Sequence, residues 1–350
     1  MSPALSKGTR TVSTKTLLSA AAFVLAVILA VPLFAQSKNL LIYFIDVEGG
    51  QSTLFVTPSG ESVLVDTGSP GDRDAARIVA AAKDAGLKQI DHLLITHFHS
   101  DHVGGVPALA AKIPIRNFYD HGETVEHDPE NGQKVWDAYE KIAKGAHHTV
   151  VTPGFKLPVK GLDWTIVSAS GKIIDHPLPG AGQPNPSCAN FKSQEVDTSE
   201  NAQSAGSIIQ FGKMRIADLG DLTWNKEGEL VCPVNKVGTV DLFVVSHHGL
   251  AISNSPALLR ALHPKVAIMD NGATKGGTVE AWTTIHNSPG LEDLWQLHFS
   301  EAGRKDHNSA ADLIANPSAS PDSAFWIKVT AHPDGHFEVT NQRNGFTKEY

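Results

Sequence analysis

Cysteine is scarce in this chain, since only Cys188 and Cys232 occur among its 350 residues. Two thiols exclude a disulfide-rich scaffold, and they also exclude a zinc module held by four cysteines. Neither cysteine lies in a zinc-type spacing, so we do not expect either to bind metal. Whether the two form a disulfide is left open by the sequence.

Positive charge is also in short supply, because 29 Lys and Arg face 37 Asp and Glu, which gives a formal net charge of −8. An acidic balance disfavours non-specific binding of nucleic acid, although metals in a nuclease site supply local positive charge. The glycine-rich segments lack the spacing that cradles phosphates, so no nucleotide site is predicted. With 41% hydrophobic residues the chain has material for a sizeable core, and an intrinsically disordered protein is excluded.

Long apolar runs are absent beyond the first 35 residues. Within them, the basic residues Lys7, Arg10 and Lys15 precede an apolar run at 17–31, and a cleavage-type Ala35 follows. This order is typical of a signal peptide over residues 1–35, and it predicts export to the periplasm or the medium. The alternative is an uncleaved membrane anchor, for which the run is shorter than the roughly 20 residues needed. After cleavage we expect no stable membrane insertion of the remaining domain, residues 36–350.

Apolar runs of strand length alternate with helical patterns along that domain. Residues 72–87 repeat apolar side chains at helical spacing, and Gly86 ends the pattern. Such mixing fits sheets covered by helices in one layered α/β domain. We expect strands at 39–46, 52–57, 62–66, 90–96, 164–168, 207–211, 214–218, 240–246 and 266–269, and helices at 72–87, 133–144, 255–262 and 278–286.

Two further segments stand apart from this pattern. Residues 171–203 are rich in Pro, Gly, Ser and Asn and show little periodicity. Because so long a connection without secondary structure is uncommon, we expect a functional loop there. Residues 325–341 alternate around a turn at 332–335, which predicts a C-terminal hairpin that extends the edge of a sheet.

The strongest chemical signal is the segment His-Phe-His-Ser-Asp-His at 97–102, which directly follows an apolar strand. Imidazole and carboxylate together suit Zn²⁺ and related divalent metals, so His97, His99, Asp101 and His102 are predicted ligands. His97 and His99 are two positions apart and point the same way in an extended chain, whereas Asp101 and His102 turn toward an adjacent position. One loop can therefore serve one or two zinc ions, or another divalent metal.

Further ligand types follow two later apolar strands. Asp221 comes after the strand at 214–218, and a carboxylate in that position can bridge two metals; Asp218 is the alternative and is more typical of a structural role. His247 and His248 follow the strand at 240–246. We assign His247 to the metal and His248 to the substrate, although the sequence does not distinguish the two.

This set of residues resembles the metallo-β-lactamase superfamily of metal-dependent hydrolases, whose motif is His-x-His-x-Asp-His. The resemblance runs from about 39 to 271 and implies a four-layer αββα sandwich. Asp66-Thr67-Gly68 resembles the family's Asp-Thr-Gly, in which Asp66 would orient a ligand histidine. Many members supply a third histidine to the first metal, and no segment here matches theirs; His121 and His176 are the substitutes that we considered.

Within the superfamily the chain is similar to the branch that contains the nuclease-like domain of DNA-uptake competence proteins. The segment 46–52, Asp-Val-Glu-Gly-Gly-Gln-Ser, resembles the opening loop of that branch, although Glu48 and the order of the glycines depart from it. The resemblance implies a supporting role for Asp46. Asn201 and Ser204 match its Asn-x-x-Ser element and would contact substrate.

We therefore expect an exported zinc-dependent hydrolase that uses a metal-bound hydroxide, because Zn²⁺ lowers the pKa of bound water to ~7. Asp101 would orient this nucleophile or carry its proton, while Asn201, Ser204 and His248 contact the substrate. A phosphodiester is favoured as the substrate, and carbonyl esters, lactones or β-lactams are the alternative. A third hypothesis is a non-catalytic binding module stabilised by metal. The expected partner is a small molecule or a phosphodiester, and nucleic acid is not favoured by the charge.

Overall fold

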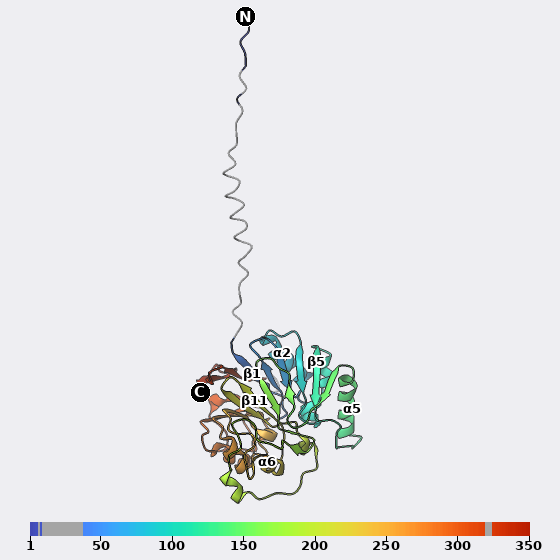
Figure 1. Ribbon diagram of the computed structural model, residues 1–350, viewed down its shortest axis with the longest axis vertical. Helices are drawn as coiled ribbons and strands as arrows, with labels where there is room; N and C mark the ends of the chain where they lie inside the picture. The colour runs from blue at the N-terminus through green and yellow to red at the C-terminus, as the bar shows by residue number, and fades with distance from the viewer. Residues whose placement is uncertain (6–7, 9–37, 319–323) are drawn as a thin grey trace. The chain divides into compact units, whose positions relative to one another are not determined.

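The computed structural model describes residues 1–5, 8, 38–318 and 324–350 (Figure 1). Ser37–Tyr350 form one compact unit. The predicted signal peptide lies almost entirely outside the described residues. In the part of the chain that is described, no helix combines the length and the apolar character that a membrane crossing requires.

The first sheet has nine strands in the order β19-β18-β17-β1-β2-β3-β4-β5-β6. It is parallel at one end, from β3 through the edge strand β6, and the C-terminal hairpin β17–β18 is attached through antiparallel pairing of β17 with β1. The strands are β1 (Leu40–Phe44), β2 (Thr53–Val56), β3 (Ser62–Val65), β4 (Ile90–Leu94), β5 (Ile115–Asp120), β6 (His147–Val150), β17 (Ile327–Ala331), β18 (Phe337–Asn341) and β19 (Thr347–Glu349).

The second sheet has eight strands in the order β16-β15-β14-β13-β12-β11-β8-β7. It is parallel from β12 through β16 and antiparallel from β12 to β7. The strands are β7 (Lys156–Leu157), β8 (Asp163–Ile166), β11 (Ser207–Phe211), β12 (Met214–Asp218), β13 (Leu242–Val244), β14 (Val266–Met269), β15 (Asp293–His298) and β16 (Ile314–Asn316). A small ribbon pairs β9 (Ser168–Ala169) with β10 (Lys172–Ile173).

Helices cover the outer face of each sheet. One apolar core lies between the sheets and includes Phe44, Phe55 and Trp164. Separate cores join each sheet to its own helices, so the domain has four layers, helix, sheet, sheet and helix. This arrangement confirms the predicted α/β class and the αββα sandwich. The first sheet is covered by α2 (Asp72–Asp84), α4 (Val106–Ala110) and α5 (Gly132–Ala143), and the second by α6 (Trp224–Val231), α7 (Pro256–Leu262) and α8 (Val279–His286).

The parallel strands of both sheets determine where the polar loops gather. The parallel strands of each sheet end at one edge, and β3, β4, β12 and β13 are each followed by a segment that carries predicted site residues. In sheets of this kind ligands bind outside the carboxyl ends of the strands. The short helix α3 (Ser100–Val103) begins inside the 97–102 segment and turns it away from β4.

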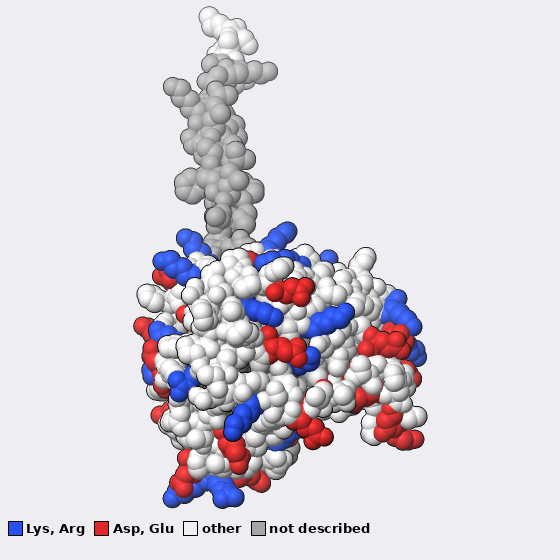
Figure 2. Space-filling model, turned by 60° about the horizontal axis from the view of Figure 1, so that its bottom comes forward, with Lys and Arg blue, Asp and Glu red and all other residues white. Residues whose placement is uncertain are grey.

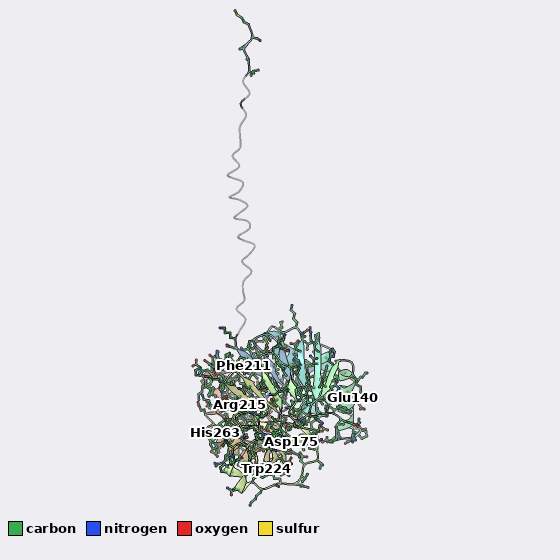
Figure 3. All side chains as sticks on the ribbon, viewed as in Figure 1. Glu140, Asp175, Phe211, Arg215, Trp224 and His263 are labelled. Atoms are coloured by element: carbon green, nitrogen blue, oxygen red, sulfur yellow. A yellow bond between two sulfur atoms is a disulfide. The ribbon has the colours of Figure 1, made fainter. Side chains whose placement is uncertain are left out.

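The loop at 171–203 is mostly irregular and contains the 3₁₀ turns η1 (Pro186–Asn190) and η2 (Glu200–Gln203). Cys188 forms a disulfide with Cys232, the residue that follows α6, which answers the question that the sequence left open. Phe191 of the loop stacks on Trp224 at the start of α6, with ring centroids 6.3 Å apart. Figure 3 labels Trp224. The loop is therefore attached to the second sheet's helical layer by a covalent bond and by an aromatic contact.

Candidate metal centre

The segment 97–102 leaves β4 in an extended conformation and then enters α3. His97 and His102 are fully buried, and His99 begins the turn with φ −67° and ψ 147°. The Nε2 atom of His97 lies 3.1 Å from Nδ1 of His99. The two imidazole rings therefore point to the same side of the chain, as expected for residues two positions apart in extended backbone. Gly50 packs against this segment so closely that a Cβ atom there would lie 2.1 Å from the carbonyl oxygen of Asp101.

One carboxylate oxygen of Asp221 is surrounded by imidazole nitrogens. Its Oδ2 atom lies 3.2 Å from Nε2 of His102, 3.4 Å from that of His248, 3.5 Å from that of His247 and 3.8 Å from that of His97. The Oδ1 atom is buried and has no hydrogen-bond partner among the described residues. A buried carboxylate with one oxygen among four imidazoles and the other unpaired is suited to bridge two cations.

Two groups of ligand atoms share His102. One comprises His97, His102 and Asp221, the other Asp101, His102 and His248, and in each the atoms lie within 4.8 Å of one another. Nε2 of His102 and Nε2 of His248 are 3.1 Å apart, and both lie 3.3 Å from Oδ2 of Asp101. This donor set of imidazole and carboxylate fits a divalent metal such as Zn²⁺. We call His97, His99, Asp101, His102, Asp221, His247 and His248 the His/Asp cluster.

Electrostatics within the His/Asp cluster favour a cation. Burial alone would lower the pKa of His102, but the carboxylates of Asp221, Asp101 and Asp66 outweigh it and hold that pKa well above its usual value. Burial would raise the pKa of Asp221, but His102, together with His248 and His247, holds it well below the usual range. A metal would replace the protons held there, so metal binding and proton release are linked.

The two adjacent histidines both reach the cluster. His247 and His248 adopt successive left-handed conformations, with φ of 53° and 54°. From the sequence we assigned His247 to the metal and His248 to the substrate. The structure places His248 in a ligand group with Asp101 and His102, and it places His247 beside Asp221. Both therefore carry an Nε2 atom toward a potential metal position.

Asp66 supports the cluster from behind. Its Oδ2 atom lies 2.7 Å from Nδ1 of His102, and the same carboxylate accepts hydrogen bonds from the amide and the hydroxyl of Thr96 at 2.8 and 2.6 Å. Nδ1 of His248 lies 3.3 Å from Oδ1 of Asp270, but neither atom makes a hydrogen bond with a described residue. The hydrogen bond from Asp66 fixes the orientation of the His102 ring.

Asp46 and Asp218 lie near the cluster but have other partners. Asp46 contacts Nε2 of His298 at 2.7 Å and a guanidinium nitrogen of Arg77 at 3.2 Å, so it holds the 46–52 loop. Gln51 of that loop donates its amide to both carboxylate oxygens of Asp218, at 2.9 and 2.8 Å. Burial raises the pKa of Asp218 to about 7. Asp218 therefore has the structural role that the sequence analysis considered more typical of it, and Asp221 is the carboxylate that faces the imidazoles.

The predicted substrate contacts at 201–204 are buried. Ser204 is fully buried, and its Oγ atom accepts a hydrogen bond from the amide of Asp221 at 3.2 Å. Asn201 is 8% exposed, and its Oδ1 atom has no partner among the described residues. Ser204 thus positions a cluster residue, and a contact of either side chain with substrate stays a prediction.

Two carboxylates that the sequence did not single out hold the outer part of the cluster. Glu126 places Oε1 3.1 Å from Nε2 of His99. Glu200, fully buried, accepts the amides of Phe98 and Val125 at 3.0 and 2.7 Å. Neither residue belongs to a motif, so no local signal marks them.

The substitutes that we considered for the missing histidine lie outside both ligand groups. His121 places Nε2 2.8 Å from Oε2 of Glu200 and so belongs to the support of the 97–99 backbone. His176 is exposed in the long loop. His99, at 3.1 Å, and Asp221, at 3.8 Å, are the donors that lie beside Nε2 of His97.

The sequence model of the metallo-beta-lactamase superfamily matches residues 46–183. These residues resemble that superfamily. The match includes Asp66 and the whole 97–102 segment, and it supports the predicted resemblance. The His/Asp cluster thus joins a metallo-β-lactamase motif to Asp221, His247 and His248 from the second half of the chain.

Curated proteins match the chain over short segments. A hydroxyacylglutathione hydrolase of Stenotrophomonas maltophilia is 46% identical over 61 residues, which is 17% of this chain and 21% of that protein. An atrochrysone carboxyl ACP thioesterase of Aspergillus fumigatus is 32% identical over 108 residues, 30% of this chain and 24% of that protein. The chain thus spans about a quarter of the length of these curated relatives or less.

Solved structures resemble the domain at low sequence identity. CmlA, a diiron β-hydroxylase of Streptomyces venezuelae, is 17% identical with a TM-score of 0.39, and 73% of this chain and 48% of that chain are covered. MEM-A1, a subclass B3 metallo-β-lactamase from a soil metagenome library, is 13% identical with a TM-score of 0.37, and 59% and 76% are covered.

Proposed function

We propose that the protein is an exported, zinc-dependent hydrolase that cleaves carboxylic esters or thioesters at the His/Asp cluster. The observation that carries this proposal is the position of Asp221, whose Oδ2 atom lies within 4 Å of four imidazole nitrogens while Asp101 joins two of the same rings. Bridged divalent sites of this composition are used for hydrolysis.

The chemistry divides between the metal and the chain. Zn²⁺ bound at the cluster would polarise the substrate and lower the pKa of a water molecule to ~7. Asp101, whose side chain is 19% exposed, would orient an attacking water and hold its proton. Asp66 holds the ring of His102 by a hydrogen bond, so that ring would need little reorganisation during the reaction.

Two observations bear on the substrate class. Relatives of the chain are named as hydroxyacylglutathione hydrolase and as ACP thioesterase, which supports a carbonyl substrate. Figure 2 displays acidic and basic side chains interspersed on the face it shows, and the net charge is −8, so a long polyanion is a poor substrate.

A phosphodiester is the second candidate. Lys275, in the loop after β14, contacts Oδ2 of Asp101 with its ammonium group, and its side chain is 41% exposed. A cation beside the cluster would attract an anionic substrate group. The resemblance of 46–52 and of Asn201 and Ser204 to the competence-protein branch points the same way. A small phosphodiester is therefore included in the test.

Export is proposed from residues 1–35 and is supported by the Cys188–Cys232 disulfide, because disulfides persist in oxidising compartments. The mature protein would act in the periplasm or the medium, and retention by an uncleaved N-terminal segment is the alternative. Cell fractionation with N-terminal sequencing tests this point, and a chain that begins at Met1 in the cytoplasm would overturn it.

The function is tested by metal content and turnover together. Mature protein purified without added metal is subjected to elemental analysis beside His99→Ala and Asp221→Ala, and then offered a thioester, a carboxylic ester and bis(p-nitrophenyl) phosphate. Bound zinc that falls in both variants, with hydrolysis of the thioester or ester, supports the proposal. Hydrolysis of the phosphodiester alone would favour the second candidate. Retained metal without turnover of any substrate would leave a binding module.

A further inference from the structure

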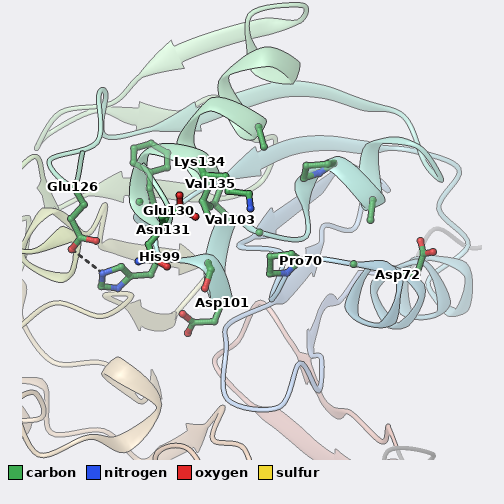
Figure 4. Close-up of a pocket in the computed structure, with 18 residues that line it drawn as sticks. Pro70, Asp72, His99, Asp101, Val103, Glu126, Glu130, Asn131, Lys134 and Val135 are labelled. Carbon is green, nitrogen blue, oxygen red and sulfur yellow. Dashed lines mark hydrogen bonds and ion pairs between the residues drawn. The ribbon is translucent and has the colours of Figure 1, made fainter. Parts of the chain in front are cut away.

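A cavity of about 800 Å³ lies directly beside the His/Asp cluster, and Figure 4 shows its lining. His99 and Asp101, both members of the cluster, form part of its wall, and so does Glu126, whose carboxylate contacts His99. The volume is within the ~300–1,000 Å³ range of small-molecule sites in proteins. A molecule that fills this cavity would therefore touch the predicted metal ligands.

Most of the wall away from the cluster is apolar. Phe98 and Val103 are buried to 1% exposure in its inner part, and the helices α4 and α5 contribute Ala108, Val135 and Ala138. Figure 4 shows Val103 and Val135 close together, on the far side of His99 from Glu126. Binding of an apolar ligand against such a wall is favourable because it removes apolar surface from water.

The charges on the lining favour an uncharged occupant. Asp72, Asp101, Glu126 and Glu130 line the cavity together with Lys134 and His99. Lys112 and Lys275 contact Asp72 and Asp101, which leaves the carboxylates of Glu126 and Glu130 beside the single ammonium group of Lys134. This wall offers an anion little attraction, whereas an uncharged hydrocarbon group is compatible with it.

We propose that this cavity is the acyl pocket of the enzyme, and that it holds the uncharged alkyl or aryl part of an acyl group whose ester or thioester carbon lies at the His/Asp cluster. The inference rests on the proposed hydrolase function and specifies its substrate. Water adds to the acyl carbon, the acyl–sulfur or acyl–oxygen bond breaks, and the leaving thiol or alcohol takes the proton. The carboxylic acid product keeps its hydrocarbon group in the pocket until it dissociates.

The test uses a series of S-acyl-N-acetylcysteamine thioesters from acetyl to octanoyl, with metal-loaded mature protein and detection of the released thiol. Because the leaving group is constant, only the acyl chain varies. We expect kcat/KM to rise about four-fold for each methylene group until the pocket is filled, the factor that corresponds to about 0.8 kcal/mol per buried CH₂.

Two substitutions on one helix give a matched comparison. Ala138→Trp places an indole ring in the pocket and should lower the ratio of octanoyl to acetyl kcat/KM by about ten-fold or more. Lys141→Trp adds the same ring to an exposed position of α5 that does not line the pocket, and it should leave the ratio unchanged. A flat chain-length profile, or the same profile in Ala138→Trp as in wild type, overturns the acyl pocket and leaves the hydrolase function standing.

A binding measurement separates failure of the pocket from failure of the function. Calorimetry with straight-chain primary amides from butanamide to octanamide needs neither turnover nor metal. Affinity that rises with chain length in wild type and Lys141→Trp, but not in Ala138→Trp, supports the pocket even if no thioester is hydrolysed. Affinity that is independent of chain length in wild type overturns it.

Discussion

His102 and Asp66 are both fully buried, and Nδ1 of the histidine lies 2.7 Å from Oδ2 of the aspartate. This contact leaves Nε2 as the ring atom that faces Asp101, Asp221 and His248. Since Asp66 is itself held by two hydrogen bonds from Thr96, the ring is oriented by a rigid part of the fold.

Replacement of Asp66 by Asn should weaken metal binding while all predicted ligands remain. An amide keeps the size of the side chain but removes the charge that orients His102 and increases its basicity. We expect a loss of about 10- to 100-fold in metal affinity, measured by competition with a chelator. Unchanged affinity in a folded Asp66→Asn protein would contradict the supporting role.

Asp221 and Asp218 provide a matched pair of buried carboxylates in one segment. Asp221→Asn removes the oxygen that four imidazoles share, so we expect metal content to fall and hydrolysis to drop at least about 100-fold. Asp218→Asn should keep its metal, because Asp218 is bound by Gln51. Elemental analysis of both variants shows which carboxylate binds the metal. Equal metal loss in both would contradict the assignment of Asp221 as the bridging ligand.

Glu200→Gln tests the support beneath Phe98 and His99. Hydrogen bonds from His121 and from the amides of Val125 and Phe98 outweigh the burial that would raise the pKa of Glu200, and they lower it to about 2. A depressed carboxyl pKa contributes stability above the unfolded value of 4.5, and that contribution is lost as the pH falls through about 2. At pH 7 the variant should therefore lose about 3 kcal/mol in urea unfolding, and less at pH 3.5.

The exposed Glu195 of the same loop serves as the control for that measurement. Glu195→Gln should change the unfolding free energy by less than about 0.5 kcal/mol, as surface substitutions do. If Glu200→Gln behaves like this control at pH 7, the buried carboxylate does not stabilise the segment.

Glu227 predicts the opposite pH dependence. It is fully buried in α6 and accepts the amides of Asn254 and Ser255, which directly precede α7, at 2.6 and 2.7 Å; burial raises its pKa to about 7. The folded state binds its proton more tightly than the unfolded state, so stability is full below pH 4.5 and is lost as the pH rises through about 7. Glu227→Gln removes this titration, and the stability difference between wild type and variant should shift by about 3 kcal/mol between pH 4.5 and 8.

Glu229, on the same helix and half exposed, is the control for Glu227. Its surface contact with Lys226 contributes little, so Glu229→Gln should follow the wild-type pH profile within about 0.5 kcal/mol. A Glu227→Gln profile parallel to that of wild type would show that Glu227 titrates alike in the folded and unfolded states.

The disulfide should stabilise the domain through the loop that it closes. Cys188 and Cys232 are 44 residues apart, and loop-closure entropy for that length corresponds to about 4 kcal/mol. The double variant Cys188→Ser, Cys232→Ser should unfold at correspondingly lower urea concentration, and wild type with reductant should match it. Identical unfolding with and without reductant would mean that the bond adds no stability.

The sequence predicted the site correctly where a residue belongs to a short motif or follows an apolar strand. The spacing of 97–102, Asp66 and the strand-end residues Asp221, His247 and His248 predicted side chains that the fold brings into contact. The helix expected at 72–87 is observed at Asp72–Asp84, because its apolar side chains repeat on one face.

Residues whose partners are far along the chain gave no such signal. Glu200 bonds to the amide of Phe98, 102 positions earlier, and Glu126 contacts a histidine 27 positions earlier. The strands β5 and β15 were not expected either. The sequence of β5, Ile-Arg-Asn-Phe-Tyr-Asp, does not alternate, and its conformation follows from pairing with β4 and β6.

The pairing of β1 with β17 has a consequence for the order in which the domain can be completed. Leu40–Phe44 lie beside Ile327–Ala331, so the first strand of the domain acquires its neighbour on one side only when nearly the whole chain has been synthesised. Until then the apolar edge of β1 is unpaired and the nine-stranded sheet stays open, which slows folding. For a protein proposed to cross a membrane, late closure of this sheet would keep the chain unfolded during translocation. Truncation before β17 would leave the edge of β1 unpaired and prone to aggregation.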